Sequence, residues 1–284
     1  MAAARQRPAA SHATGDGFKL HRRGLRLAGR DHTVIGLRPG TAIRFSTNRY
    51  HQTWHVLGDD DSARLLGRLL WGLAYTRRPG TLVVLDLPFL DPNPFDAEPA
   101  DPVVLVPDDL TGFGTAGARA LHGRLPLRSR PDGTVRWHTP GLDLALADPW
   151  AWWERGEGDA FWRRGTDGIV ERRGGLLVMR ATAPVLRAWA VMVASLSSAN
   201  RYRTDDAQFA SGGDGGWWPD GEVQIFADYR RRVGVAQVAR REVLAAEASA
   251  RGAEAPVPGS TPDDVRQAIW RHGNAVARRR PRPR

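Results

Sequence analysis

The sequence predicts a mixed α/β protein with a partly parallel central sheet and disordered basic tails. A helix-forming segment over residues 59–77 leads through a turn into a continuous apolar run over residues 81–87. This order is typical of a helix that precedes a strand buried on both faces. The same order recurs more weakly downstream. Apolar residues make up 42% of the 284-residue chain, so a sizeable core is expected.

The elements of the first half follow from periodicity and turn residues. Residues 59–77 place leucines at a helical spacing of three to four, and the acidic residues at 59–61 suit the positive end of the helix dipole. Pro79 and Gly80 end this helix before the strand Thr81–Leu87. The other elements expected before residue 150 are a helix over Thr115–His122 and strands over Thr33–Leu37, Thr41–Ser46, Gln52–Leu57, Val103–Val106, Thr134–His138 and Leu142–Ala147.

The second half continues the mixture of helices and strands. A helix over Pro184–Ser197 carries proline in its first turn, where the missing N–H has no cost. A last helix begins at Thr261, and Val265, Ile269 and Val276 share one of its faces, so part of it should dock on the core. The remaining expected elements are strands over Gly168–Glu171, Leu176–Arg180 and Glu222–Ala227, and a long helix over Asp228–Arg251.

Composition divides the chain into four regions. We expect residues 1–30 to form a flexible basic leader and residues 31–250 to form the α/β core. This core is either one unit or two subdomains that meet near residues 125–150. Residues 251–260 are rich in Pro, Gly and Ala and form a linker, and residues 261–284 form a helix with an Arg-rich tail.

Basic residues concentrate in the two terminal regions. Residues 1–30 carry a net charge of +6 and residues 265–284 carry +7, which leaves −3 for the interior out of a total of +10. Basic tails bind polyanions without sequence readout, so nucleic acid or another polyanion is the expected partner. Alternatively the tails only solvate the chain, since forty arginines against one lysine are also typical of a GC-rich bacterial genome. The candidate polyanion-binding residues are Arg22, Arg23, Arg278, Arg279 and Arg280.

Several chemistries are excluded by what the sequence lacks. There is no cysteine, which excludes thiolate nucleophiles, disulfides and cysteine-ligated metals. The single lysine, Lys19, lies outside any phosphate-binding glycine motif, and neither G-x-S-x-G nor H-E-x-x-H occurs. The sequence therefore identifies no cofactor and no metal site, and it leans against an enzyme.

No segment predicts insertion into a membrane. The longest apolar stretch, Ala183–Leu196, is interrupted by Arg187 and is too short to span a bilayer. Residues 1–11 are rich in Ala and Arg but lack the apolar stretch of a signal peptide. We therefore expect a cytoplasmic protein.

A glycine motif follows one predicted strand. Gly112, Gly114 and Gly117 match G-x-G-x-x-G, whose glycines let a backbone approach a pyrophosphate at a helix N-terminus. Five residues separate the strand from Gly112, and Asp108 and Asp109 would repel phosphate. A flexible glycine loop is therefore the favoured interpretation, and a ligand-binding loop is the alternative.

Two histidines are candidates for acid–base chemistry. His51 and His55 are four residues apart, a spacing that would place both on one face of a helix. The surrounding residues favour a strand, where the two lie roughly 13 Å apart and cannot share one metal ion. A single histidine acting as an acid or base remains the functional interpretation.

The loop after the strand at 81–87 carries the favoured catalytic candidates. Asp86 lies at the end of this strand and Asp91 just beyond it, at the edge where open α/β sheets bind ligands. The loop over 88–102 contains five prolines and four acids, Asp91, Asp96, Glu98 and Asp101. Such carboxylates bind Mg²⁺ or act as general bases, although prolines and acids are also ordinary in solvated loops.

Eleven tryptophans are the remaining unusual feature. Trp217 and Trp218 lie between glycine-rich segments, which suggests a lid or a ligand-binding loop. A second cluster near Trp150 favours packing, or self-association through an aromatic surface. Packing in the core is the expected role of Trp54, Trp71, Trp189 and Trp270.

Three functions remain open from the sequence. The first is a binding or accessory protein whose basic tails contact nucleic acid or another polyanion, and whose tryptophan loop contacts a ligand or protein partner. The second is an enzyme acting on a nucleotide- or phosphate-containing substrate at the acidic loop after Asp86. The third is a structural protein that assembles through tryptophan-rich surfaces.

Overall fold

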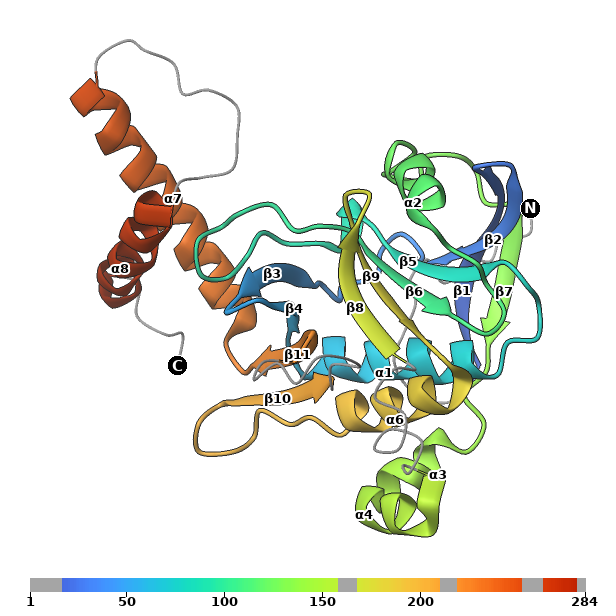
Figure 1. Cartoon of the computed structure of the whole chain (residues 1–284). Helices are drawn as coiled ribbons and strands as arrows, with labels where there is room; N and C mark the ends of the chain where they lie inside the picture. The colour runs from blue at the N-terminus through green and yellow to red at the C-terminus, as the bar shows by residue number, and fades with distance from the viewer. Residues whose placement is uncertain (1–16, 158–167, 210–218, 252–262, 280–284) are drawn as a thin grey trace, which may run out of the picture.

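The computed structural model describes residues 17–157, 168–209, 219–251 and 263–279, which form a mixed α/β fold with two sheets (Figure 1). The strands are β1 (Phe18–Leu27), β2 (Arg30–Gly36), β3 (Ser46–Tyr50), β4 (Thr53–Gly58), β5 (Thr81–Leu85), β6 (Val103–Pro107), β7 (Gly133–Trp137), β8 (Gly168–Arg173), β9 (Leu176–Ala181), β10 (Thr204–Phe209) and β11 (Gly221–Phe226). The helices are α1 (Asp60–Ala74), α2 (Thr115–His122), α3 (Leu142–Ala147), α4 (Pro149–Trp152), α6 (Ala183–Ala194), α7 (Tyr229–Arg251) and α8 (Asp263–Arg279), with short helical turns η1 (Leu87–Phe89) and η2 (Trp153–Glu157).

The larger sheet has seven strands in the order β7-β1-β2-β5-β6-β9-β8. β2 runs parallel to β5, and β6 runs parallel to β9, whereas the other pairs are antiparallel. β5 and β6 are buried along their whole length, which explains why their sequences are continuous apolar runs rather than alternating ones. The predicted partly parallel sheet is therefore confirmed.

The smaller sheet has four strands in the order β10-β11-β4-β3. Two antiparallel hairpins, β3–β4 and β10–β11, join through a parallel pairing of β4 with β11. One face of this sheet presents Val56, Val223 and Ile225 to the main core. Segments that are far apart in the sequence thus become neighbours only in this sheet.

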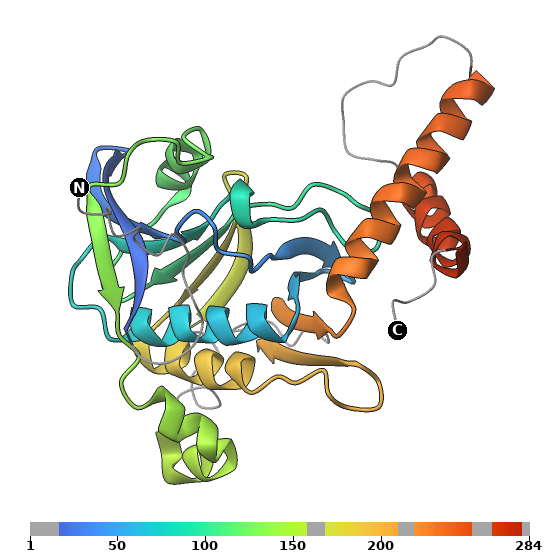
Figure 2. The ribbon, with the colours of Figure 1, turned by 180° about the vertical axis from the view of Figure 1, so that it is seen from behind.

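Helices α1 and α6 lie side by side and form the main core with one face of the larger sheet (Figure 2). The two helices approach closely at Gly67, where an added Cβ would lie 2.6 Å from Cβ of Ala194. A second, smaller core lies on the opposite face of the sheet, beneath α2. Asp59 caps α1, because its carboxylate accepts hydrogen bonds from the Ser62 N–H at 2.9 Å and from the Ser62 hydroxyl.

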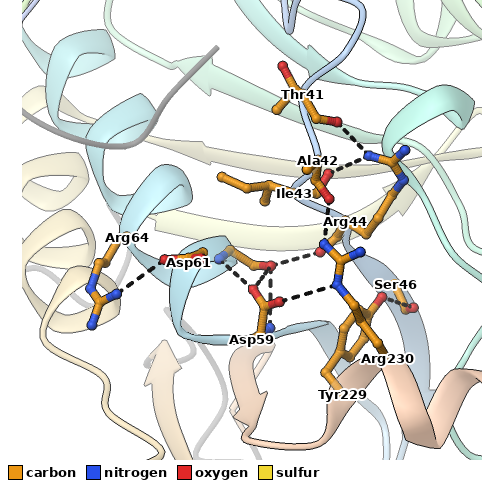
Figure 3. A network of polar contacts seen from close by, with 11 residues as sticks. Thr41, Ala42, Ile43, Arg44, Ser46, Asp59, Asp61, Arg64, Tyr229 and Arg230 are labelled. Carbon is orange, nitrogen blue, oxygen red and sulfur yellow. Dashed lines mark hydrogen bonds and ion pairs between the residues drawn. The ribbon is translucent and has the colours of Figure 1, made fainter. Parts of the chain in front are cut away.

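Helix α7 joins the body beside the start of α1 (Figure 3). The Ser46 hydroxyl donates to the carbonyl of Pro92, so the Tyr229 hydroxyl, 2.6 Å away, must donate to Ser46. Arg230 donates to the carbonyl of Ala42 at 2.6 Å, and its guanidinium also lies 4.0 Å from Asp59. These contacts fix the direction in which the α7–α8 pair leaves the body.

The N-terminal segment differs from the sequence analysis. Residues 18–30 were assigned to a flexible leader, but they form β1 and the first residue of β2. Phe18, Leu20 and Leu27 are buried while Lys19 and Arg22 are exposed. In the sequence, the charge of the whole segment obscures these buried apolar positions.

Other elements also differ from the sequence predictions. Leu142–Ala147 was predicted as a strand and forms α3, because Leu and Ala favour helix and the segment lacks β-branched residues. Thr41–Ser46 was predicted as a strand, yet regular pairing with β4 starts only at Ser46, and Phe45 makes an isolated bridge to Leu90. α8 continues to Arg279 rather than ending before the arginine run.

Among the described helices, none is long and apolar enough to cross a bilayer.

Candidate nucleic-acid interface

Pairing of β1 with β7 brings two arginine-rich segments together. The pairing is antiparallel and places Lys19 opposite Arg136. Residues 17–30 and 123–137 together contain nine Arg and Lys residues and a single acidic residue, Asp132. Because the two segments are about a hundred residues apart in the sequence, this concentration of charge exists only in the folded chain.

The loop before β7 is bonded along β1. Arg23 of β1 donates to the carbonyls of Ser129, at 3.1 Å, and Leu127, at 3.4 Å. Asp86, which follows β5, accepts a hydrogen bond from the Leu127 N–H at 2.9 Å. Asp132 accepts one from the Gly24 N–H at 2.5 Å. The loop is therefore held at several points and presents its remaining side chains from a fixed backbone.

Arg23 and Asp86 are the buried charges beneath this loop. Arg23 is 8% exposed and Asp86 is 7% exposed. Burial raises the pKa of Asp86, although the Leu127 N–H and the charge of Arg23 partly offset it. Burial also lowers the pKa of Arg23, while Asp86 and Asp132 act in the opposite direction. Each charge thus reduces the cost of burying the other.

Most exposed charged side chains on these segments are basic, although Asp132 is exposed as well and Arg26 lies 3.6 Å from Asp31; we call seven of the basic ones the basic edge. Beside them lies an open hollow of about 640 Å³, lined by Leu25 and residues 123–129. Burial and the nearby Arg23 and Arg38 lower the pKa of His21, which favours its neutral form. The basic edge consists of Lys19, Arg22, Arg26, Arg124, Arg128, Arg130 and Arg136.

The two favoured carboxylates, Asp86 and Asp91, have different surroundings. Asp86 contacts the loop before β7, whereas the Asp91 N–H donates to the carbonyl of Phe45 at 2.7 Å. Burial raises the pKa of Asp91, and the guanidinium groups of Arg44 and Arg230 partly offset this. The structure does not bring the two carboxylates into one site.

The other acids of the loop over 88–102 are paired with arginines. Glu98 lies 3.4 Å from both Arg240 and Arg266. Asp101 accepts two hydrogen bonds from Arg172. In the described part of the chain, no group of three or more His, Asp or Glu side chains is arranged to hold a metal ion. These acids therefore attach α7, α8 and β8 to the loop.

The glycine motif does not form a tight strand-to-helix turn. β6 ends at Pro107 and α2 begins at Thr115, with Gly114 as an N-cap residue at a negative φ of −88°. Asp108 lies 2.8 Å from Arg180 in an ion pair. Gly112 and Gly117 also lack a positive φ. The tight-turn geometry of a pyrophosphate-binding loop is therefore not formed.

The two histidines lie in different environments. His51 occupies the turn between β3 and β4 with a φ of +46°, and its ring makes an edge-to-face contact with Tyr50. His55 lies within β4 and is buried, with its Nε2 atom 3.7 Å from Oε2 of Glu222. Glu222 was not singled out in the sequence, because only the parallel pairing of β4 with β11 places it beside His55.

The tryptophans have several roles. Trp152 contacts Trp71 through tilted rings and Trp153 edge to face, next to the core, and Trp189 is buried against Phe209. Trp150 is 72% exposed. Trp217, Trp218 and Arg280 lie outside the described residues.

Sequence analysis missed Arg124, Arg128, Arg130 and Arg136. The available signal was four arginines within thirteen residues. It was passed over because the charge of the terminal regions was larger, and because nothing in the sequence predicts that β1 pairs with β7.

Comparison with known proteins adds no relative: no protein-family model, curated protein or solved structure matches this chain.

Proposed function

We propose that this protein binds nucleic acid through the basic edge. The observation that carries the proposal is the pairing of β1 with β7, which brings two segments with exposed Arg and Lys side chains to one edge of the sheet, Lys19 and Arg136 on one face and Arg22 on the other. Arginine matches phosphate oxygens with a planar pair of donors. A surface of this charge releases counterions from a phosphate backbone, which drives binding without sequence preference.

Two features favour nucleic acid over an anionic membrane. Within residues 17–38 and 123–137, no large apolar side chain of the described structure is strongly exposed, whereas surface-bound membrane segments insert apolar side chains. The loop carrying Arg128 and Arg130 is also fixed by Arg23 and Asp86. A fixed backbone loses little entropy on binding a regularly spaced phosphate chain.

The test compares two triple variants by fluorescence anisotropy. Arg128→Gln/Arg130→Gln/Arg136→Gln removes three charges from the basic edge. Arg64→Gln/Arg201→Gln/Arg203→Gln is the matched control, since these arginines are exposed and lie elsewhere, with Arg64 and Arg203 beside Asp59–Asp61. A labelled duplex and a labelled single strand, each of about 20 nucleotides, are titrated at low and moderate salt. Circular dichroism melting confirms that each variant folds.

We expect the basic-edge variant to bind at least tenfold more weakly than the wild type. The slope of log K against log salt should become shallower by roughly 2–3, since about one counterion is lost per phosphate contact. The control should bind within about twofold of wild type. Equal affinity of the basic-edge variant and wild type would show that the interface lies elsewhere. Binding to anionic vesicles but to neither oligonucleotide would identify a lipid partner instead.

A further inference from the structure

Helix α8 presents a second polar surface, which we call the α8 stripe. Val265, Ile269 and Val276 pack against α7 and bury one side of the helix. The opposite side is exposed, and its residues recur at the spacing of three to four that defines one helical face. The α8 stripe consists of Gln267, Trp270, Arg271, Asn274 and Arg278.

Trp270 is the unexpected member of this stripe. The sequence analysis assigned it to packing, but it is 55% exposed. The apolar positions that do pack are Val265, Ile269 and Val276, and Trp270 follows the buried Ile269 by one residue, which turns it away from α7. An exposed indole next to arginine suits stacking on an unpaired base.

The charge of the α8 stripe is uncompensated. On α8 the acidic residues are Asp263 and Asp264 in the first turn, so none lies among residues 267–278. Within the described part of the chain, no carboxylate pairs with Arg271 or Arg278. Other arginines of the helical pair face inward and are neutralised, as Arg240 and Arg266 are by Glu98.

The α8 stripe and the basic edge lie at opposite ends of the molecule. Figures 1 and 2, which view the chain from opposite sides, both place α7 and α8 at one end and β1 and β7 at the other. The two sheets lie between them. One continuous phosphate backbone would have to pass along the whole body of the protein to reach both surfaces.

We infer that the protein holds two segments of nucleic acid at once, one on the basic edge and a single-stranded one on the α8 stripe. This inference rests on the proposed function of the basic edge. The partner on α8 is recognised by phosphate contacts to Arg271 and Arg278 and by base stacking on Trp270. Each molecule then bridges two strands.

A bead assay tests the bridging directly. A biotinylated oligo(dT) of about 20 nucleotides is immobilised, full-length protein is added, and capture of a fluorescent oligo(dT) of equal length is measured. Oligo(dT) does not pair with itself, so capture requires the protein. The stripe variant is Trp270→Ala/Arg271→Gln/Arg278→Gln, and Arg64→Gln/Arg201→Gln/Arg203→Gln is the control. Light scattering measures the oligomeric state of each protein.

We expect wild type and control to capture the second strand, and the stripe variant to capture at least fivefold less. Anisotropy should show that the stripe variant still binds one strand within about threefold of wild type, because the basic edge is intact. If wild type binds oligo(dT) but captures no second strand, the bridging inference fails and the proposed function stands. If wild type binds no oligonucleotide, the proposed function fails as well. Undiminished capture by the stripe variant would also overturn the inference, and a dimer in light scattering would then explain the capture.

Discussion

Nε2 of His55 lies 3.7 Å from Oε2 of Glu222, across the parallel strands β4 and β11. Both side chains are almost fully buried. Nδ1 of His55 has no hydrogen-bond partner among the described residues, and neither has Oδ1 of Asn48, which lies opposite His55 on β3. Burial lowers the pKa of His55 to about 4. Burial, together with the charge of Asp206, raises the pKa of Glu222 to about 7.

The first prediction is a pH-dependent effect of Glu222→Gln on stability. Because the folded pKa of Glu222 exceeds its ordinary value of 4.5, stability is lost as pH rises from about 4.5 to about 7. Glutamine has the same shape and no charge, so it removes this loss. The variant should match wild type near pH 5 and melt a few degrees higher near pH 8, measured by calorimetry, since about 1 kcal/mol shifts Tm by roughly 2–4 °C.

His55 provides the control for this prediction. Its lowered pKa has the opposite sign, so its contribution to stability is lost as pH falls from 6.5 toward about 4. His55→Gln should therefore reduce the loss of stability on the acidic side and leave the alkaline side unchanged. If Glu222→Gln shifts Tm equally at both pH values, the effect is one of packing rather than ionisation.

The sequence predicted those elements whose signal is local. The leucine spacing of α1 and the apolar runs of β5 and β6 need no knowledge of the rest of the chain. All three elements form, although α1 ends at Ala74 rather than residue 77 and β5 ends at Leu85 rather than Leu87. β1 was missed because its buried residues alternate with arginines, so charge obscured the strand pattern. β10 was missed for a related reason, since Thr204–Phe209 includes two aspartates and a glutamine.

The candidate site was less predictable than the fold. Arg23 was singled out as a residue of a polyanion-binding tail, but the structure places it buried in β1, where it supports a loop. The exposed arginines of that loop gain significance only from the register of β1 with β7. Which distant segments pair depends on the whole fold. Local sequence patterns therefore do not predict that β1 pairs with β7.

The second prediction concerns the buried charges Arg23 and Asp86. Asp86→Asn removes one of the two carboxylates, Asp86 and Asp132, whose charges offset the burial of the Arg23 guanidinium, which should lower the free energy of unfolding by about 1–3 kcal/mol. Urea denaturation measures this loss. The double variant Arg23→Met/Asp86→Asn leaves no buried charge, so it should be more stable than the sum of the two single effects predicts. Strict additivity would show that the two charges do not interact.

The third prediction uses two helical glycines with different surroundings. Gly67 lies at the contact of α1 with α6, where an added Cβ would meet the carbonyl oxygen of Ala190 at 2.7 Å. Gly234 lies in α7 with nothing within 4 Å of an added Cβ. Gly67→Ala should destabilise by about 1–3 kcal/mol through overpacking. Gly234→Ala should stabilise by roughly 0.5–1 kcal/mol through helix propensity. A stabilising Gly67→Ala would mean that the two helices can move apart at little cost.

The fourth prediction concerns the attachment of the α7–α8 pair to the body. Glu98 lies 3.4 Å from both Arg240 of α7 and Arg266 of α8, and Asp96 lies 3.8 Å from Arg266. Glu98→Gln keeps the shape but removes the charge between two half-buried guanidinium groups, which then repel each other. Amide hydrogen exchange should become several-fold faster in α8 and in the second half of α7, while α1 keeps its protection, because local opening does not require global unfolding.

Asp61→Asn is the matched control, since Asp61 pairs only with the exposed Arg64 among the described residues, at 3.2 Å. Equal acceleration in α1 and α8 would indicate that the helical pair and the body unfold as one unit, and that Glu98 contributes to global rather than local stability.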